Sequence, residues 1–315
     1  MSARSIVLLV CILATLAISI FVPLYYSSTI NNPGAGQSDN TSSSTISYNV
    51  TTSVTTSYDP IISSSSSSTI VQPKMAIPLY SESLSDWYQV FNTSSNGRIV
   101  VLNANYGPGS AYDPTYALIA KLAQQTGTTV LGYVYTNYAD GSIPVSEVEQ
   151  WISDWYNWYH VDGIFFDEVQ STCTNQSIQY YTALYNYTKS EPGSNIVVLN
   201  PGNPIGACYG PISDIIVTFE GNYADYLSNY DNASWTSYYP ASHFWHIVYN
   251  ATTLAQMQYT IQLASQRRAG WIYVTDGLAH NVNALGRLPI YLCQEAQYLD
   301  PVGNSCQANT TSTNT

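Results

Sequence analysis

Eight short apolar runs recur along the middle of the chain, and they constrain its fold more than any other feature. Polar or turn-forming residues close the runs, and most are followed by a helical pattern. Their nearly continuous hydrophobicity is typical of strands covered on both faces, as in a parallel sheet. The runs occupy residues 75–80, 98–104, 129–136, 162–168, 195–202, 214–220, 243–249 and 270–276.

Helical periodicity fills the gaps between these runs. Apolar residues repeat three and four positions apart within 148–159 and again within 254–264, ahead of Arg267 and Arg268 at the expected helix end. Eight strand–helix alternations predict an α/β fold, a (β/α)8 TIM barrel, over residues 73–301. The alternative, a doubly wound open sheet, is disfavoured because no G-x-G-x-x-G turn follows the first strand.

Composition excludes two broad classes of protein. Only 9% of residues are charged and the net charge is -12, so the chain has no basic stripe for nucleic acid and we expect no nucleic-acid partner. The 45% hydrophobic fraction, with 29 Tyr and 7 Trp, excludes a wholly disordered chain. A polar surface built from uncharged side chains suits an extracellular setting.

The N-terminal part predicts a membrane address. Residues 5–26 carry no charge and directly follow Arg4. This uncharged segment is long enough to cross a bilayer, so we predict a transmembrane signal-anchor over residues 1–26, with a cleaved signal peptide as the alternative. Residues 27–72 are rich in Ser and Thr and predict a disordered stalk, and 302–315 form a polar tail. We therefore expect the barrel on the extracellular face of the membrane, or secreted if the leader is cleaved.

Sequons and cysteines agree with this address. Apart from Cys11 the chain has four cysteines, which allow three pairings, and free buried thiols are a further alternative. We favour Cys173 with Cys208 and Cys293 with Cys306, because each pair closes a local loop. The N-x-Ser/Thr sequons, predicted to carry glycans, are at Asn40, Asn49, Asn92, Asn175, Asn186, Asn232, Asn250 and Asn309.

Carboxylates, amides and aromatic side chains gather where the predicted strands end. In a TIM barrel these ends meet at one mouth, which is where the chemistry takes place. Amides and acids bind hydroxyl groups and aromatic rings stack on sugar faces, so the set predicts a carbohydrate site. The candidate catalytic acids are Asp167, Glu168 and Glu220, and the candidate substrate-binding residues are Tyr80, Asn103, Asn105, Tyr133, Tyr135, Asn200, Tyr249 and Asp276.

Structural salt bridges would be the simpler explanation of the strand-end acids. The Lys and Arg residues of the predicted barrel precede strands, lie in helices or follow the last strand, so we expect no cation beside these acids. Neighbouring unpaired carboxylates raise one another's pKa, as glycoside hydrolysis requires. Asp276, in a T-D-G sequence, is as well explained by a turn.

Five ordered motifs resemble the spherulin-4 family (spherulation-specific family 4). They are LNANYGPG, LGYVYTNY, VDGIFFDE, VVLNPGN and IIVTFE, within residues 75–276. The resemblance implies a (β/α)8 glycoside hydrolase, since studied fungal members cleave α-1,4-linked N-acetylgalactosamine in galactosaminogalactan. It also implies functional acids at Asp167, Glu168 and Glu220. Two departures are NANYGPG in place of N-P-x-x-G-P-G and Tyr249 in place of a His.

Analogy with barrel enzymes on α-linked sugars assigns Asp167 as nucleophile, Glu220 as general acid/base and Glu168 as a group that tunes Asp167. Exchange of the Asp167 and Glu168 roles stays open, as does retention against inversion. We expect a polysaccharide substrate, no cofactor, no metal and a monomer. The rival hypothesis is a catalytically inactive carbohydrate-binding or structural cell-surface barrel.

Overall fold

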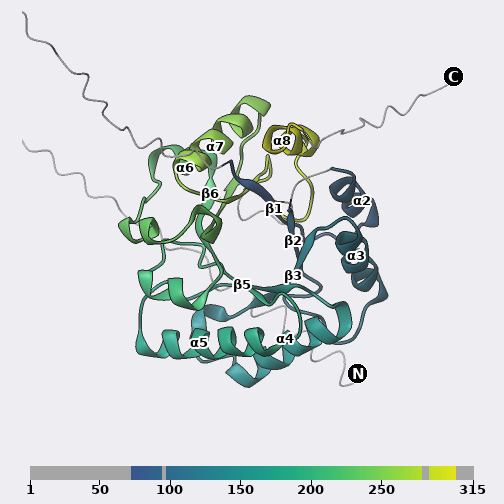
Figure 1. Ribbon diagram of the computed structural model, residues 1–315, viewed down its shortest axis with the longest axis vertical. Coiled ribbons are helices and arrows are strands. Elements are labelled where there is room, and N and C mark those ends of the chain that lie inside the picture. Colours follow the sequence, from purple (N-terminus) through teal and green to yellow (C-terminus); the bar gives the residue numbers. More distant parts are fainter. Residues whose placement is uncertain (1–71, 94–96, 279–283, 303–315) are drawn as a thin grey trace, which may run out of the picture. The chain divides into compact units, whose positions relative to one another are not determined.

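The computed structural model describes residues 72–93, 97–278 and 284–302. Within them the chain forms a closed barrel of eight parallel strands, each hydrogen-bonded to the next in sequence and β8 to β1 (Figure 1). The predicted TIM barrel is thus confirmed, and all eight predicted strands are present. They are β1 Lys74–Pro78, β2 Ile99–Leu102, β3 Thr129–Tyr135, β4 Gly163–Asp167, β5 Ile196–Leu199, β6 Ile215–Asn222, β7 Phe244–Tyr249 and β8 Trp271–Val274.

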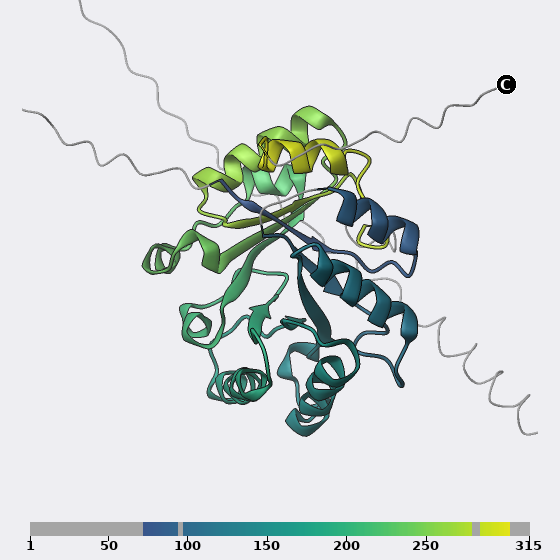
Figure 2. The same ribbon diagram turned by 45° about the vertical axis from the view of Figure 1, so that its right-hand side comes forward.

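Helices surround the barrel (Figures 1 and 2). The two helices predicted from periodicity are α4 and α7, and α7 ends next to Arg267 as expected. Between β5 and β6 the described chain has 3-10 turns over Ala207–Ile212 in place of a helix; Pro211 within this stretch has no N–H to donate to a helical turn. The helices are α2 Leu84–Asn92, α3 Pro114–Gln125, α4 Val145–Tyr159, α5 Asn175–Ser190, α6 Tyr223–Ser228, α7 Leu254–Gln266 and α8 Leu292–Leu299.

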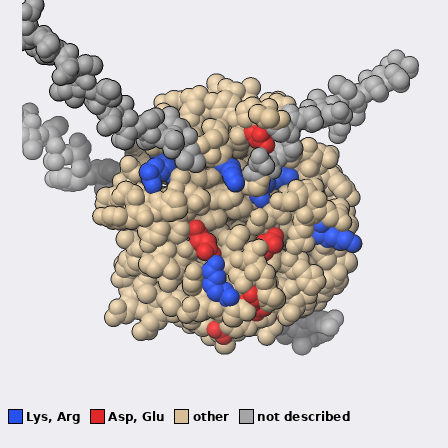
Figure 3. Space-filling model, viewed as in Figure 1, with Lys and Arg blue, Asp and Glu red and all other residues tan. Residues whose placement is uncertain are grey.

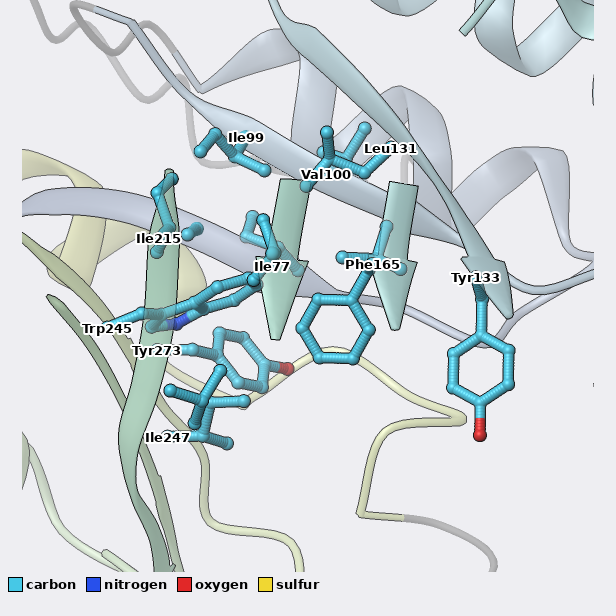
Figure 4. Close-up of a cluster of buried hydrophobic side chains, with 14 of the residues drawn as sticks. Ile77, Ile99, Val100, Leu131, Tyr133, Phe165, Ile215, Trp245, Ile247 and Tyr273 are labelled. Atoms are coloured by element: carbon cyan, nitrogen blue, oxygen red, sulfur yellow. The ribbon is translucent and has the colours of Figure 1, made fainter. Parts of the chain in front are cut away.

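Aromatic and branched side chains fill the barrel interior (Figure 4). The Phe165 ring lies 5.4 Å from the Trp245 ring and 6.2 Å from the Tyr133 ring, between centroids. Alternate residues of each strand point inward. The strand register makes Tyr133, Phe165 and Val198 neighbours, and Ile247 and Tyr273. In β4, β5 and β7 the same alternation carries the inward row to the C-terminal ends of the strands, where it supplies Asp167, Asn200 and Tyr249.

One predicted disulfide is confirmed. Cys173 and Cys208 are bonded, with their Cα atoms 6.1 Å apart, and they link the loop after β4 to the turns after β5. Cys293 lies in α8, and its predicted partner Cys306 lies outside the described residues.

The predicted anchor of 1–26 lies outside the described residues, as do the stalk of 27–72 except its last residue and the tail of 302–315 except its first. Among the helices that the structure describes, none has the length and apolarity needed to cross a membrane.

Glycosylation stays a prediction. Of the sequon asparagines, Asn92, Asn175, Asn186 and Asn232 are exposed and Asn250 is half-buried. Asn40, Asn49 and Asn309 lie outside the described ranges. Charged side chains are few on the face drawn in Figure 3, in keeping with the low charged fraction.

Candidate active site

Two carboxylates meet at the mouth of the barrel through one amide. Asp167 ends β4, Glu220 lies in β6, and Asn200 follows β5 between them. The Asn200 Nδ2 group donates to Asp167 Oδ1 at 2.8 Å and to Glu220 Oε2 at 2.6 Å. The distance between Asp167 Oδ1 and Glu220 Oε2 therefore cannot exceed the sum of these two hydrogen-bond lengths. The sequence prediction that acids of different strands converge here agrees with this geometry for Asp167 and Glu220.

Two tyrosines complete the hydrogen bonding of the pair. Tyr133 Oη donates to Asp167 Oδ2 at 2.7 Å, and Tyr249 Oη donates to Glu220 Oε1 through a short bond. Burial, reinforced by the nearby carboxylates, raises the pKa of both phenols, so they stay protonated donors. Each carboxylate thus accepts one hydrogen bond from a phenol and one from the shared amide.

Tyr80 is the third aromatic residue at the pair. Its ring meets the Tyr133 ring edge to face with centroids 5.3 Å apart. Burial first, and then Asp167 and Glu220, raise the pKa of the Tyr80 phenol well above its ordinary value. The structure therefore brings together six residues predicted for the site: Asp167, Glu220, Asn200, Tyr133, Tyr249 and Tyr80, which follows β1.

The electrostatics of the site favour a proton on Asp167. Burial raises the pKa of Asp167 to about 7, and the neighbouring Glu220 carboxylate adds to the rise. The Tyr133 hydrogen bond acts in the opposite direction, but it is the weaker influence. The only ion pairs within the described residues are Lys189 with Asp214 and Arg287 with Asp276, so no described cation neutralises the pair.

Glu168 leaves the strand instead of continuing it. Its backbone is left-handed, with φ 52°, and its carbonyl accepts from the Tyr138 N–H at 2.6 Å and from Thr136 Oγ1 at 3.0 Å. The hydrogen bonds that join Asp167 to Glu220 do not include it. Its charge still raises the pKa of Asp167, although less than burial and Glu220 do. This position fits a tuning group better than the centre of the site.

The expectation that no cation lies beside the strand-end acids is wrong for Asp276. Arg287 donates to Asp276 Oδ2 at 2.7 Å and to Oδ1 at 3.0 Å, and the Ile290 N–H donates to Oδ1 at 3.1 Å. These bonds hold the pKa of Asp276 below its ordinary value, against the effect of burial. Arg287 returns from beyond the last strand, which its place in the sequence could not reveal. Asp276 is therefore an ion-paired group and not part of the carboxylate pair.

The remaining predicted residues lie around the pair. Asn103 follows β2, and its buried Oδ1 has no hydrogen-bond partner among the described residues. Tyr135, at the end of β3, stacks on Trp151 with ring centroids 5.8 Å apart, while Asn105 is exposed in the loop after β2. None of the three hydrogen-bonds to the carboxylate pair.

Sequence reasoning missed Tyr138, in the loop after β3. The Tyr138 side chain is 45% exposed, and charges on Glu168, Asp167 and Glu220 all act on its phenol, so the ring lies near the pair. Asn137, Tyr138 and Ala139 all have positive φ, and such strained backbone is common at functional sites. The T-N-Y sequence carries no pattern that announces this conformation.

The fold and the site define a class: a (β/α)8 barrel with a hydrogen-bonded carboxylate pair at its mouth. Residues 74–286 match the model of spherulation-specific family 4, and the chain belongs to this family. Spherulin-4 of Physarum polycephalum is 32% identical over 235 residues, which cover 71% of this chain and 69% of the relative.

A solved structure shares the fold. The crystal structure of Aspergillus clavatus Sph3 in complex with GalNAc superposes with a TM-score of 0.63 at 22% identity. The match covers 73% of this chain and 98% of Sph3. The family match and the relative confirm the resemblance that the five motifs indicated, and the solved structure agrees with the barrel fold.

Proposed function

We propose that this protein is a retaining glycoside hydrolase that cleaves α-linked (N-acetyl)galactosamine-type polysaccharide. The observation that carries the proposal is the pair of half-buried carboxylates on one amide, with no described cation beside them. Salt bridges would explain structural acids, and a binding surface needs no pair of carboxylates without a cation. Glycoside hydrolysis needs one carboxyl group that donates a proton and a second that stays ionised.

The separation of the pair supports retention. Carboxyl groups of retaining enzymes lie roughly 5–5.5 Å apart, whereas inverting enzymes leave roughly 6.5–9.5 Å for a water molecule. The Asn200 amide holds one oxygen of each carboxylate at 2.8 and 2.6 Å from a single nitrogen, which confines the two oxygens to the shorter range. A covalent glycosyl intermediate therefore suits this geometry.

The raised pKa of Asp167 supports the opposite assignment of catalytic roles to the one that the sequence suggested. A carboxyl group with a pKa of about 7 keeps its proton at mildly acidic pH and donates it to the leaving oxygen. We accordingly place Asp167 as general acid/base and Glu220 as nucleophile, with the Tyr249 and Asn200 hydrogen bonds stabilising the Glu220 carboxylate. Glu168 keeps the tuning role expected for it.

The substrate class rests on the relatives. Sph3 binds GalNAc, as its crystal structure records, and the family resemblance implies the α-1,4 linkage. Tyr80, Tyr133, Tyr135 and Tyr138 line the mouth with rings of the kind that stack on sugar faces. An endo-α-1,4-N-acetylgalactosaminidase activity is the specific form of the proposal.

The test is digestion of defined polymers by the full-length chain. Purified protein is incubated with α-linked N-acetylgalactosamine, α-linked galactosamine and β-linked N-acetylglucosamine polymers, and the products are sized. We expect shortening of the α-linked hexosamine polymers, with products that first appear in the α configuration by NMR. Binding without shortening would favour the inactive carbohydrate-binding barrel, and β products would exclude retention.

Azide separates the two carboxylate roles. In Asp167→Asn, azide should restore turnover and give an α-glycosyl azide, because the nucleophile Glu220 is intact. In Glu220→Gln it should give the β-glycosyl azide, because azide then replaces the nucleophile. The opposite pairing of products would return the nucleophile role to Asp167.

We also propose the location that the sequence suggests: residues 1–26 anchor the chain in the membrane, 27–72 form a stalk, and the barrel faces the exterior as a monomer. Alkaline extraction of membranes, with protease treatment of intact cells, tests the first three points. Release of the intact protein by salt alone would count against the anchor.

A further inference from the structure

We propose that a β-bulge at Thr218, held from outside the barrel by His246, is what turns Glu220 into the active site. Thr218, Phe219 and His246 are on this view positioning residues for Glu220. The inference rests on the proposed function for its activity readout, but the bulge itself can be tested without turnover.

The register of β6 against β7 carries the argument. Val217 pairs with Trp245, whereas Phe219 pairs with His246 and Glu220 with Ile247. Thr218 is therefore an extra residue with no partner in β7. Paired residues of neighbouring strands point to the same face of the sheet. Val217 and Glu220 therefore both point into the barrel, because their partners Trp245 and Ile247 do.

Strict alternation would give the opposite result. Val217 and Glu220 are three positions apart, and in a regular strand such residues point to opposite faces. A straight β6 would thus direct Phe219 into the barrel and Glu220 toward the helices. The inserted Thr218 shifts the alternation by one residue, so that Glu220 points into the barrel. Bulges beside active sites are known to redirect side chains in this way. The insertion also brings Asn222 level with Tyr249.

Aromatic packing holds the Phe219 side chain on the outer face of the barrel, opposite to the direction that regular alternation would give it. The Phe219 ring lies 4.6 Å from the Tyr226 ring and 6.1 Å from the Tyr230 ring, between centroids. The Arg267 guanidinium lies over these two tyrosines, at 4.3 and 4.4 Å from their ring centres. Moving Phe219 inward would empty this outer cluster, so its packing opposes the straight register.

His246 holds the inserted residue itself. It is fully buried, and its Nε2 lies 3.1 Å from Thr218 Oγ1 while its Nδ1 lies 2.8 Å from Tyr226 Oη. Burial lowers the pKa of His246 to about 3, so the ring is neutral, with one nitrogen donating and the other accepting. The Tyr230 hydroxyl also lies 3.5 Å from His246 Nε2, so the buried neutral imidazole has three hydroxyl partners, and together they give Thr218 Oγ1 a fixed place on the outer face.

The first experiment compares matched threonine variants of the full-length chain. Thr218→Val keeps the shape and loses the hydroxyl, and Thr218→Ser keeps the hydroxyl. Thr260→Val is the control, because Thr260 is a buried threonine of α7 whose hydroxyl bonds Gln256 O at 2.8 Å. We expect at least a tenfold fall in kcat with KM within twofold for Thr218→Val. Thr218→Ser and Thr260→Val should stay within twofold of the parent.

A second comparison covers the packing of the bulge. Phe219→Ala should lower kcat by more than tenfold, and Phe219→Leu should restore most of it. Phe91→Ala is the matched control, because Phe91 is another half-buried phenylalanine, stacked on Trp87 in α2. An equal fall of kcat in Phe91→Ala or Thr260→Val would show general destabilisation and overturn the proposal.

Thiol labelling reads the direction of residue 220 without any substrate. In Glu220→Cys, a small charged methanethiosulfonate should label residue 220 through the barrel mouth. Adding Thr218→Val or Phe219→Ala should slow this labelling at least tenfold, while adding Phe91→Ala should not. Unchanged labelling and unchanged kcat in both would overturn the proposal. A parent that labels as expected but cleaves no polymer would refute the proposed function and leave the bulge inference standing.

Discussion

Carboxylates stand at the ends of β4 and β6 and at the end of β8, but their surroundings differ. Asp167 and Glu220 point inward, share an amide and have no described cation beside them. Asp276 follows β8 and is held by Arg287. A strand-end carboxylate can therefore belong to a hydrogen-bonded pair of acids or to an ion pair with a cation from a distant loop. Position along the strand alone does not decide this.

The largest test of this contrast removes one carboxylate at a time. Asp167→Asn and Glu220→Gln should each lower kcat by about a hundred- to ten-thousand-fold, because acid/base and nucleophilic groups act in the transition state. Asp276→Asn should lower it less than about threefold, since the site is separate. Steady-state rates on an α-linked hexosamine polymer, with circular dichroism for folding, decide the matter. Comparable losses in all three variants would erase the contrast.

The next-largest effect concerns the two phenols that hydrogen-bond to the carboxylate pair, those of Tyr133 and Tyr249. Tyr249→Phe and Tyr133→Phe should each lower kcat by about ten- to a hundredfold, because a hydrogen bond to a charged group contributes roughly 1.5–3 kcal/mol. Tyr238→Phe, at a side chain that is 85% exposed, is the control. A rise in KM with kcat unchanged would instead assign the two hydroxyls to ground-state sugar binding.

Stability should also respond to pH through Glu295, a fully buried acid of α8 outside the carboxylate pair. Burial raises its pKa to about 8, with its Oε1 accepting from the Val274 N–H at 3.0 Å. Its folded pKa exceeds the unfolded value of about 4.3, so its contribution to stability is complete below that pH and is lost as pH rises through about 8.

Glu295→Gln should therefore leave the thermal midpoint nearly unchanged at pH 4 and raise it at pH 9, by an amount on the order of several kcal/mol in unfolding free energy. Thermal unfolding at the two pH values measures this, with the exposed Glu147→Gln as control. A lower midpoint at pH 9 would show that the charged form of Glu295 is the stabilising one.

The smallest effect is expected at Asp276, the acid that is ion-paired with Arg287. Its contribution to stability depends on pH in the opposite direction to that of Glu295. The lowered pKa of Asp276 means that its contribution is present above about pH 4 and is lost as pH falls. Because the Arg287 side chain is 40% exposed, Asp276→Asn should cost less than about 1 kcal/mol at pH 7 and nothing measurable at pH 3. Chemical denaturation at both pH values checks this; a large cost at pH 3 would point to packing instead of charge.

The barrel was predictable from sequence because each strand is buried on both faces and reads as an apolar run. The convergence of Asp167, Asn200 and Glu220 followed from the rule that parallel strands end at one mouth. The direction of Glu220 could not be read, because strict counting from Val217 gives the wrong face and nothing in I-V-T-F-E marks Thr218 as inserted. Arg287 was equally hidden, since its return to Asp276 depends on a loop path. The left-handed Tyr138 and Glu168 are set by contacts between two loops.

The shared amide also bears on how the protein ages. Its orientation is fixed, because Asn200 Oδ1 accepts from the Gly202 N–H at 3.2 Å while Nδ2 faces the two acids. Spontaneous deamidation of asparagine proceeds through attack by the backbone nitrogen of the next residue, which must lose a hydrogen. That residue is Pro201, whose nitrogen has none to lose. An aspartate at 200 would add a third negative charge between two others, so this dipeptide protects the pair from the chemical lesion that would damage it most.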